Sequence, residues 1–339
     1  MTEPLFYKNR MVDLLEKNRK KLCWSRLSRN KNAIPILEKN LTKIKWVDVC
    51  RNPAGISLLN QNPKKIKWNA LSGNPNAISI LEKNFNKINW KVLSKNPNAI
   101  TLLEQNPKKI NWLWLSGNPN AVKIMEKYPN KIDYSFLSSN PNAIHLLEQN
   151  PEMIDWGDLS INPNAIKLLE QNPEKINMEV FSFNLNAIPF LEQNQDMISS
   201  FWLSKNKNAI KFLEKNQDKI NWSALSINPN AIHLLEQNQD KINWSSLSIN
   251  PNAIHLLEQN PDKIDFWALS MNPNAINILE KNQDKIHWCV LSSNEGVNEY
   301  NYPFFKQRMD LIREDLMKAV YSPARVAYHL EQEDDEYFN

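Results

Sequence analysis

The sequence is poor in residues on which many functional sites depend. Its 339 residues include only five Gly and three Cys. No P-loop, G-x-G-x-x-G, G-x-S-x-G or H-E-x-x-H pattern occurs, so we expect no catalytic residue and no cofactor site. The cysteines, Cys23, Cys50 and Cys289, form neither a C-x-x-C pair nor a disulfide framework, which is typical of a reducing compartment.

Long hydrophobic runs are also missing. None approaches the ~18–20 apolar residues that span a bilayer, and the first residues, MTEPLFYKNR, lack the apolar core of a secretory signal. We therefore expect a cytoplasmic protein without a membrane segment.

Charge is unevenly distributed along the chain. Residues 1–120 hold 22 Lys+Arg against 7 Asp+Glu, a balance of +15, whereas residues 121–339 hold 19 against 30, a balance of −11. The N-terminal part is therefore suited to an acidic partner.

What the sequence has in abundance is repetition. LSINPNAIHLLEQN occurs twice, 22 residues apart, and an aromatic residue recurs every 22 positions from Trp24 to Trp288 except at Met178 and Ser200. Six positions after each of these marker residues stands an Asn, from Asn30 to Asn294. A fixed period of this length predicts stacked units, because one unit alone cannot bury its apolar face.

Each unit is predicted to be a helical hairpin. Asn250 suits an N-cap and Pro251 a first turn, and the following residues form one amphipathic stripe. A second Asn-Pro start at Asn260 predicts a second helix, each helix having about 8–10 residues. The alternative is a leucine-rich repeat, but Lys91 and its equivalents stand where the strand of that repeat needs Leu.

These observations predict an all-α fold, an α-solenoid of about twelve 22-residue units. Residues 1–23 are predicted to form a partial N-terminal capping repeat, residues 24–294 the solenoid, and residues 295–339 a helical C-terminal cap with an acidic tail. We expect a cap because the last unit would otherwise expose its core face.

The recurring W-x-x-L-S-x-N-P-N-A-I-x-L-L-E-x-N-P-x-K-I resembles the short tandem repeats of proteins encoded by giant DNA viruses of the mimivirus and marseillevirus kind. The resemblance covers residues 24–294, and FKQRMDLIREDLMKAVYSPARVAYHL is similar to the closing segment of such proteins. It implies a viral interaction protein acting in the cytoplasm of an infected host, and carries no catalytic residues.

Two polar columns are candidates for chemistry, and both favour structure. His145, His233 and His255 share one exposed column, but no Cys or acid recurs beside them at metal spacing, so we expect no metal site. Ser recurs four residues after the marker in nearly every unit, where a buried hydroxyl satisfying a helix end explains it better than a nucleophile does.

The remaining candidate site is a basic stripe in the N-terminal half. Lys-Lys pairs occupy the positions where later units carry an acid and Lys, and Lys beside free helix amides favours anions. We expect this stripe to bind the acidic surface of a protein partner. Nucleic-acid binding through the same residues and a structural role in a virion or viral factory are the alternatives. The stripe comprises Arg26, Arg29, Lys45, Arg51, Lys64, Lys65, Lys67, Lys108 and Lys109.

Overall fold

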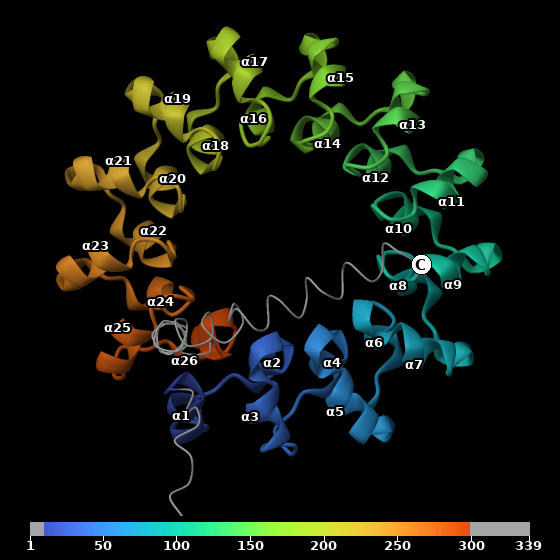
Figure 1. Cartoon of the computed structure of the whole chain (residues 1–339), viewed down its shortest axis with the longest axis horizontal. Coiled ribbons are helices and arrows are strands. Elements are labelled where there is room, and N and C mark those ends of the chain that lie inside the picture. The colour runs from blue at the N-terminus through green and yellow to red at the C-terminus, as the bar shows by residue number, and fades with distance from the viewer. Residues whose placement is uncertain (1–9, 299–339) are drawn as a thin grey trace, which may run out of the picture.

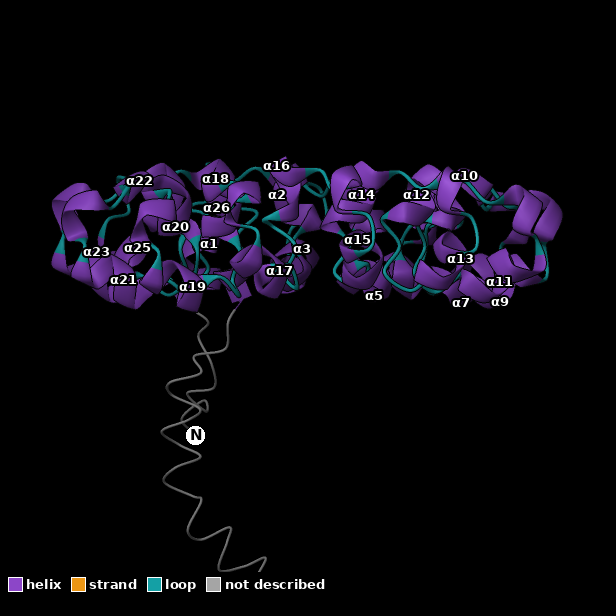
Figure 2. Cartoon of the chain, turned by 90° about the horizontal axis from the view of Figure 1, so that it is seen from above, coloured by secondary structure: helices purple, strands orange, loops and turns teal. Residues whose placement is uncertain are grey.

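A computed structural model describes residues 10–298, which form a closed ring of short helices (Figure 1). Even-numbered helices make the inner circle and odd-numbered helices the outer circle. Seen edge-on, the two sets lie toward opposite faces of the ring (Figure 2). No strand occurs among these residues, which confirms the predicted α-solenoid.

The inner helices are α2 (Trp24–Arg29), α4 (Trp46–Arg51), α6 (Trp68–Leu71), α8 (Trp90–Leu93), α10 (Trp112–Ser116), α12 (Tyr134–Ser138), α14 (Trp156–Ile161), α16 (Met178–Phe181), α18 (Ser200–Lys205), α20 (Trp222–Ile227), α22 (Trp244–Ile249), α24 (Phe266–Leu269) and α26 (Trp288–Leu291). The outer helices are α1 (Arg10–Lys17), α3 (Ile34–Glu38), α5 (Ile56–Gln61), α7 (Ile78–Glu82), α9 (Ile100–Glu104), α11 (Val122–Lys127), α13 (Ile144–Glu148), α15 (Ile166–Glu170), α17 (Ile188–Gln193), α19 (Ile210–Lys215), α21 (Ile232–Gln237), α23 (Ile254–Gln259) and α25 (Ile276–Lys281).

The helices are shorter than the sequence pattern predicted. After each outer helix, the second start, which is Asn-Pro or Asn-Gln in most units, opens only a single turn, and this turn is a 3-10 helix in ten units. After the turn Pro261–Lys263, for example, the backbone of Ile264 is extended, with φ −70° and ψ 125°. This extended residue prevents the turn from continuing into a longer helix. The N-cap of α24 is Asp265, whose carboxylate accepts hydrogen bonds from the backbone amides of Trp267 and Ala268.

Those turns are η3 (Pro63–Lys65), η5 (Phe85–Lys87), η6 (Pro107–Lys109), η7 (Pro129–Lys131), η8 (Pro151–Met153), η9 (Pro173–Lys175), η10 (Gln195–Met197), η11 (Gln217–Lys219), η12 (Gln239–Lys241) and η13 (Pro261–Lys263). Four further 3-10 turns follow inner helices, namely η1 (Lys31–Ala33), η2 (Pro53–Gly55), η4 (Pro75–Ala77) and η14 (Glu295–Asn298).

The core runs as one continuous layer between the two circles. Each unit contributes a fully buried inner-helix residue, usually Leu, and most units add an Ala-x-x-Leu-Leu set or a close variant of it from the following turn and outer helix. The marker aromatics, such as Trp156 and Trp244, are only half-buried and pack at the edge of this layer. The marker aromatics thus cover the edge of the core without entering it fully.

Side-chain hydrogen bonds join each unit to the one before it. Asn96 is 1% exposed, and its Nδ2 donates to the carbonyls of Ser72 (3.2 Å) and Asn74 (3.0 Å) of the preceding unit. Its Oδ1 accepts from the amide of Asn98, but the predicted N-cap role was wrong: a turn follows Asn96, and the N-cap residue of α9 is Ala99. The Ser72 hydroxyl accepts from the Asn89 amide of the next unit at 2.9 Å, so both polar columns connect neighbouring units.

The same bonds close the ring between its two ends. Asn30 donates to the carbonyls of Ser292 (3.3 Å) and Asn294 (2.7 Å), Asn32 donates to that of Glu295, and the Cys23 amide donates to the Ser292 hydroxyl at 3.0 Å. Inside the ring the corresponding Asn-to-Ser offset is 24 residues, and at the seam it is 262. The sum of the two offsets is 286 residues, which is thirteen times the 22-residue period, so the ring contains thirteen units.

The thirteenth unit is assembled from both ends of the described chain. Its inner helix is α26, and α1 occupies the place of its outer helix, in contact with η14. Leu14, Leu15 and Leu22 enter the core at the positions that Ile278, Leu279 and Ile286 hold one unit earlier. The described residues of the predicted partial capping repeat, 10–23, therefore complete the last unit of the ring and cover its core face. The predicted C-terminal cap falls almost wholly on residues 299–339, outside the described part.

Candidate interaction surface

The inner helices present three columns of side chains that the outer helices do not cover. They are the residues one, two and five positions after each marker, which we call the inner surface. In α14, for example, Leu159 and Ser160 are fully buried against the outer circle, whereas Asp158 and Ile161 are exposed. The columns one and five after the marker are exposed or half-buried in every unit, whereas the column two after it is buried at Asp48, Ala70, Ala224, Ala268 and Val290. All three columns vary from unit to unit.

The structure distributes the predicted basic stripe over three kinds of element. Arg26, Arg29 and Arg51 lie on the inner helices α2 and α4, Lys45 and Lys67 are N-cap residues, and the two Lys-Lys pairs lie in η3 and η6. All nine side chains are exposed. The Lys-Lys pairs do not lie at the start of a helix of useful length, since η3 and η6 have three residues each. The predicted anion-binding corner is therefore not formed.

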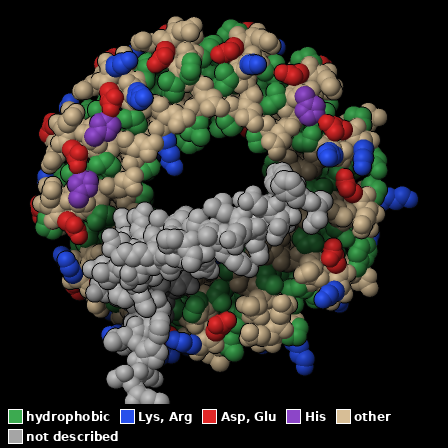
Figure 3. Space-filling view, viewed as in Figure 1, with side chains coloured by type: hydrophobic (Ala, Val, Ile, Leu, Met, Phe, Trp, Pro, Cys, Tyr) green, Lys and Arg blue, Asp and Glu red, His purple; other side chains and the backbone are tan. Residues whose placement is uncertain are grey.

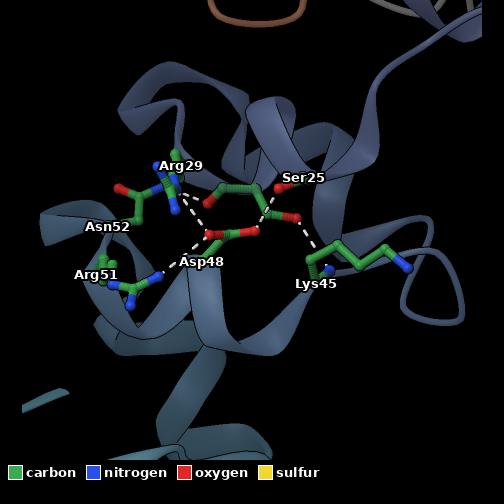
Figure 4. Close-up of polar contacts among 7 residues, drawn as sticks. Ser25, Arg29, Lys45, Asp48, Arg51 and Asn52 are labelled. Carbon is green, nitrogen blue, oxygen red and sulfur yellow. Dashed lines mark hydrogen bonds and ion pairs between the residues drawn. The ribbon is translucent and has the colours of Figure 1, made fainter. Parts of the chain in front are cut away.

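Arg29 and Arg51 are brought together by a buried carboxylate (Figure 4). Asp48 is 3% exposed, and its carboxylate lies 2.7 Å from Nε of Arg29 and 3.6 Å from Nη1 of Arg51. The Ser25 hydroxyl donates to it at 2.6 Å, while Lys45 extends away from it. Burial opposes ionisation, but the bonds from Ser25 and Arg29 and both guanidinium charges hold the pKa of Asp48 below its ordinary value.

This arrangement leaves part of both guanidinium groups exposed and able to contact a partner. The Arg29 and Arg51 side chains remain 59% and 50% exposed, and each guanidinium has five N–H donors, of which Asp48 uses few. Asp158 occupies the same column with no Arg beside it. There burial and the Asp155 charge raise the carboxyl pKa. The arginine pair thus makes α2 and α4 the basic part of the inner surface.

Other lysines of the repeat lie over aromatic rings. Lys109 is 4.1 Å from the ring centroid of Phe85 and 4.8 Å from that of Trp90. The same contact with a marker ring 19 residues earlier in the chain is made by Lys175, Lys241, Lys263 and Lys285. The recurring Lys column therefore covers the half-buried rings. Sequence reasoning missed this role, although the constant 19-residue spacing from an aromatic residue was a usable signal.

Beyond α8 the inner surface becomes largely apolar. Phe183 packs against Trp202 at 5.6 Å and Trp202 against Phe201 at 5.1 Å, with Lys205 over both rings of α18. Trp267 is 53% exposed. Further exposed apolar residues of the inner surface are Leu113, Ile161 and Ile227. A set of this kind at equivalent positions is typical of a binding surface.

Residues five after one marker contact residues two after the next. The pairs are an ion pair for Arg29 and Asp48, a cation–π contact for Lys95 and Trp114, and a ring contact for Phe183 and Trp202. Where the second residue is bulky the first can be Gly, as in Gly73 beside Val92 and Gly117 beside Phe136. In the sequence the two members of each pair stand 19 residues apart, and this spacing of complementary side chains was a usable signal for the contact.

The His column lies on the outer helices. His145, His233 and His255 each contact a Glu of the preceding unit, at 3.0 Å for His145 and Glu126 and 2.5 Å for His255 and Glu236. Figure 3 shows this face of the ring with histidines beside acidic side chains. Residues 10–298 hold no group of three His, Cys, Asp or Glu able to surround a metal ion.

Comparison with known proteins gives one match. Residues 28–197 match the model of the family described as Periplasmic copper-binding protein (NosD), whereas no curated protein and no solved structure matches. Among the described residues, no helix has the length and apolarity to cross a bilayer. The matched segment consists of 22-residue units, and it brings no metal-ligand set with it. Because the match extends over half of its length, the chain belongs to the family described as Periplasmic copper-binding protein (NosD).

Proposed function

We propose that this chain is a non-enzymatic ring scaffold that binds a protein partner on its inner surface. The observation that carries the proposal is the combination of half-exposed guanidinium groups on α2 and α4 with exposed apolar side chains on α10 to α24. A partner segment with both acidic and apolar side chains fits these two parts. The resemblance to giant-virus repeats supports a role in the cytoplasm of an infected cell.

The dimensions of the ring allow such a segment to enter. Thirteen helices packed at ~8–10 Å place their axes on a circle roughly 33–41 Å across, and subtracting a helix width of ~10–12 Å leaves about 20–30 Å. Figure 3 displays an opening between the inner helices. An α-helix with its side chains, about 10–12 Å wide, is small enough to lie against one arc of the inner surface.

The charge of the inner surface favours protein over nucleic acid. Its three columns contain six cationic residues, Arg26, Arg29, Arg51, Lys91, Lys95 and Lys205, against Asp48, Asp158 and Glu179, a balance of +3. The units from Trp222 to Ser293 carry no charge in these columns. A nucleic-acid backbone would need cations along its whole path.

Copper binding, which the family description names, lacks support from the residues of this chain. The described part offers no group of three ligating side chains, and the His column pairs with Glu across neighbouring helices. The proposal therefore rests on the inner surface alone.

The test compares two charge-reversal variants in affinity capture from cells that express the natural partners. Arg26→Glu with Lys91→Glu alters the inner surface without touching the Asp48 ion pairs, and Lys123→Glu with Lys167→Glu makes the same charge change on the outer helices α11 and α15. We expect the first variant to lose a protein that the wild type and the second variant retain, as identified by mass spectrometry.

Three results would count against the proposal. Equal retention by both variants would exclude the inner surface. A gel shift with RNA or DNA that weakens log-linearly with salt would favour nucleic acid. Recovery with capsid proteins alone, unaffected by either variant, would favour a structural role in the virion.

A further inference from the structure

The seam of the ring places two of the three cysteines side by side. Cys23 is the N-cap residue of α2, and Cys289 is the second residue of α26, the neighbouring inner helix across the seam. The two thiols are close enough that each perturbs the pKa of the other. The Cys23 amide is fixed on the Ser292 hydroxyl at 3.0 Å, and Lys21 lies 5.1 Å from the Trp288 ring centroid, so both backbones are anchored at this point.

The position of the pair follows from the register of the repeat. Within the ring, the residue one after a marker lies beside the residue one before the next marker. Asn69 and Asn89 are hydrogen-bonded in this way at 2.8 Å, and Ser245 and Asp265 at 2.5 Å. Cys289 and Cys23 occupy these two positions across the seam. Their contact is thus built into the interface by the same backbone geometry as the polar pairs.

We propose that Cys23 and Cys289 form a reversible disulfide that locks the ring at its seam. With a small-molecule disulfide such as oxidised glutathione as the oxidant, the Cys23 thiolate attacks one sulfur, and one glutathione thiolate leaves. Cys289 then loses its proton to solvent and attacks the Cys23 sulfur of the mixed disulfide, releasing the second glutathione. Two protein thiols are oxidised and one disulfide is reduced to two thiols.

The surroundings of the cysteines fit these roles. Although burial opposes ionisation, the nearby Arg26 backbone amide, the contact with Cys289 and the Arg26 charge hold the pKa of Cys23 below its ordinary value. Both seam cysteines are half-buried, which leaves them within reach of a small oxidant. Cys50 is fully buried in the Ser column, and burial raises its pKa, so it serves as an internal negative control.

The disulfide would determine whether the ring can open. Apart from the seam, every interface is bridged by continuous backbone, so the seam is the place where non-covalent contacts alone hold neighbouring helices together. A reducing compartment leaves it free to part, and an oxidant closes it covalently. This inference depends on the closed ring and is independent of the proposed partner.

The experiment oxidises the full-length protein with oxidised glutathione and examines it by intact mass, peptide mapping and non-reducing gel. We expect a loss of 2 Da, a peptide joining Cys23 to Cys289, and faster migration that dithiothreitol reverses. Because the cross-link closes a very long loop, the melting temperature should rise by roughly 5–10 °C.

Matched variants test whether the cross-link depends on the position of the two seam cysteines or on general thiol reactivity. Cys50→Ser restores the usual residue of its column and should behave as the wild type, whereas Cys23→Ser and Cys289→Ser should lose the cross-link and the rise in melting temperature. Circular dichroism verifies that each variant is folded. Glutathione adducts or intermolecular dimers in place of the cross-link would overturn the proposal. Cross-linking at the same rate in guanidinium would also overturn the proposal, because the reaction would then not depend on the folded ring.

Discussion

Replacing one buried Asn of the ladder tests the physical basis of the ring. Asn140 is 1% exposed, and its side chain makes three hydrogen bonds, to the carbonyls of Ser116 (3.0 Å) and Asn118 (3.1 Å) and from the amide of Asn142. Asn140→Ala removes all three, which deprives the buried Ser116 carbonyl and the Asn142 amide of these bonds, while the Asn118 carbonyl still accepts from the Ala121 amide at 3.0 Å. At about 1 kcal/mol for each bond, with a further cost for buried unsatisfied groups, we expect a loss of about 3–5 kcal/mol.

Urea unfolding followed by circular dichroism at 222 nm measures this loss. Asn142→Ala is the matched control, because its exposed side chain donates a single bond across the same interface, to the Pro119 carbonyl at 3.0 Å. We expect the control to lose about 1 kcal/mol or less. If Asn140→Ala costs no more than Asn142→Ala, buried hydrogen bonds do not hold the units together and the explanation of the Asn column is wrong.

The same substitution at the seam should have a different effect on shape. Asn30→Ala removes the bonds to the Ser292 and Asn294 carbonyls, where no continuous backbone connects the two units. We expect the radius of gyration from small-angle X-ray scattering under reducing conditions to increase for Asn30→Ala and to stay nearly constant for Asn140→Ala. Equal values for the two variants would mean that the seam is no weaker than the other interfaces.

Three further predictions concern single sites. The pKa of Asp48 is lower in the folded protein than its ordinary 3.8, so the unfolded chain takes up this proton at higher pH than the folded chain does. The stabilisation from the Asp48 carboxylate is therefore lost as pH falls below about 4. The difference in melting temperature between wild type and Asp48→Asn should shrink from pH 7 to pH 3. Gly55→Ala should cost about 1–3 kcal/mol in urea unfolding, since its Cβ would lie 2.7 Å from the Val49 carbonyl oxygen and 2.9 Å from Val49 Cγ1. Adding Val49→Leu, the usual residue there, should recover the part of the loss that the Cγ1 contact causes; no recovery would assign the loss to the backbone contact. Lys241→Ala should cost about 0.5–1 kcal/mol and increase iodide quenching of Trp222, whose ring Lys241 covers at 4.7 Å; unchanged quenching would argue against that cover.

The repeat and its helical character could be predicted from the sequence because they depend on local pattern. The spacing of Ala, Ile and Leu along Ala253–Leu257 indicates one amphipathic face whatever the neighbours do. Helix length was overestimated because Asn260-Pro261 is a start signal for a 3-10 turn as well as for a helix. What ends that turn is the extended backbone at Ile264, and extended backbone at a single apolar residue has no distinctive sequence signal.

Closure of the ring could not be predicted from the pattern, because a constant period fixes no rotation between units. The sequence did place Leu14, Leu15 and Leu22 in phase with the repeat, which was consistent with an end cap and equally with half of a thirteenth unit. All nine residues of the basic stripe are exposed, yet the grouping of Arg29 and Arg51 depends on Asp48, whose carboxylate draws them together. That pairing acts across an interface and appears only once adjacent helices are placed.

Closure also accounts for the strictness of the period. A full turn shared among thirteen interfaces is roughly 28° for each, and in an open solenoid one deviating interface merely bends the array. In a ring the same deviation displaces the two ends, so it must be absorbed elsewhere or it parts the contact between Asn30 and Asn294. A chain under this constraint tolerates no insertion between Trp24 and Asn294, and none is present. The inner surface escapes the constraint, since its side chains can change without changing the rotation between units, and it is there that the units differ most.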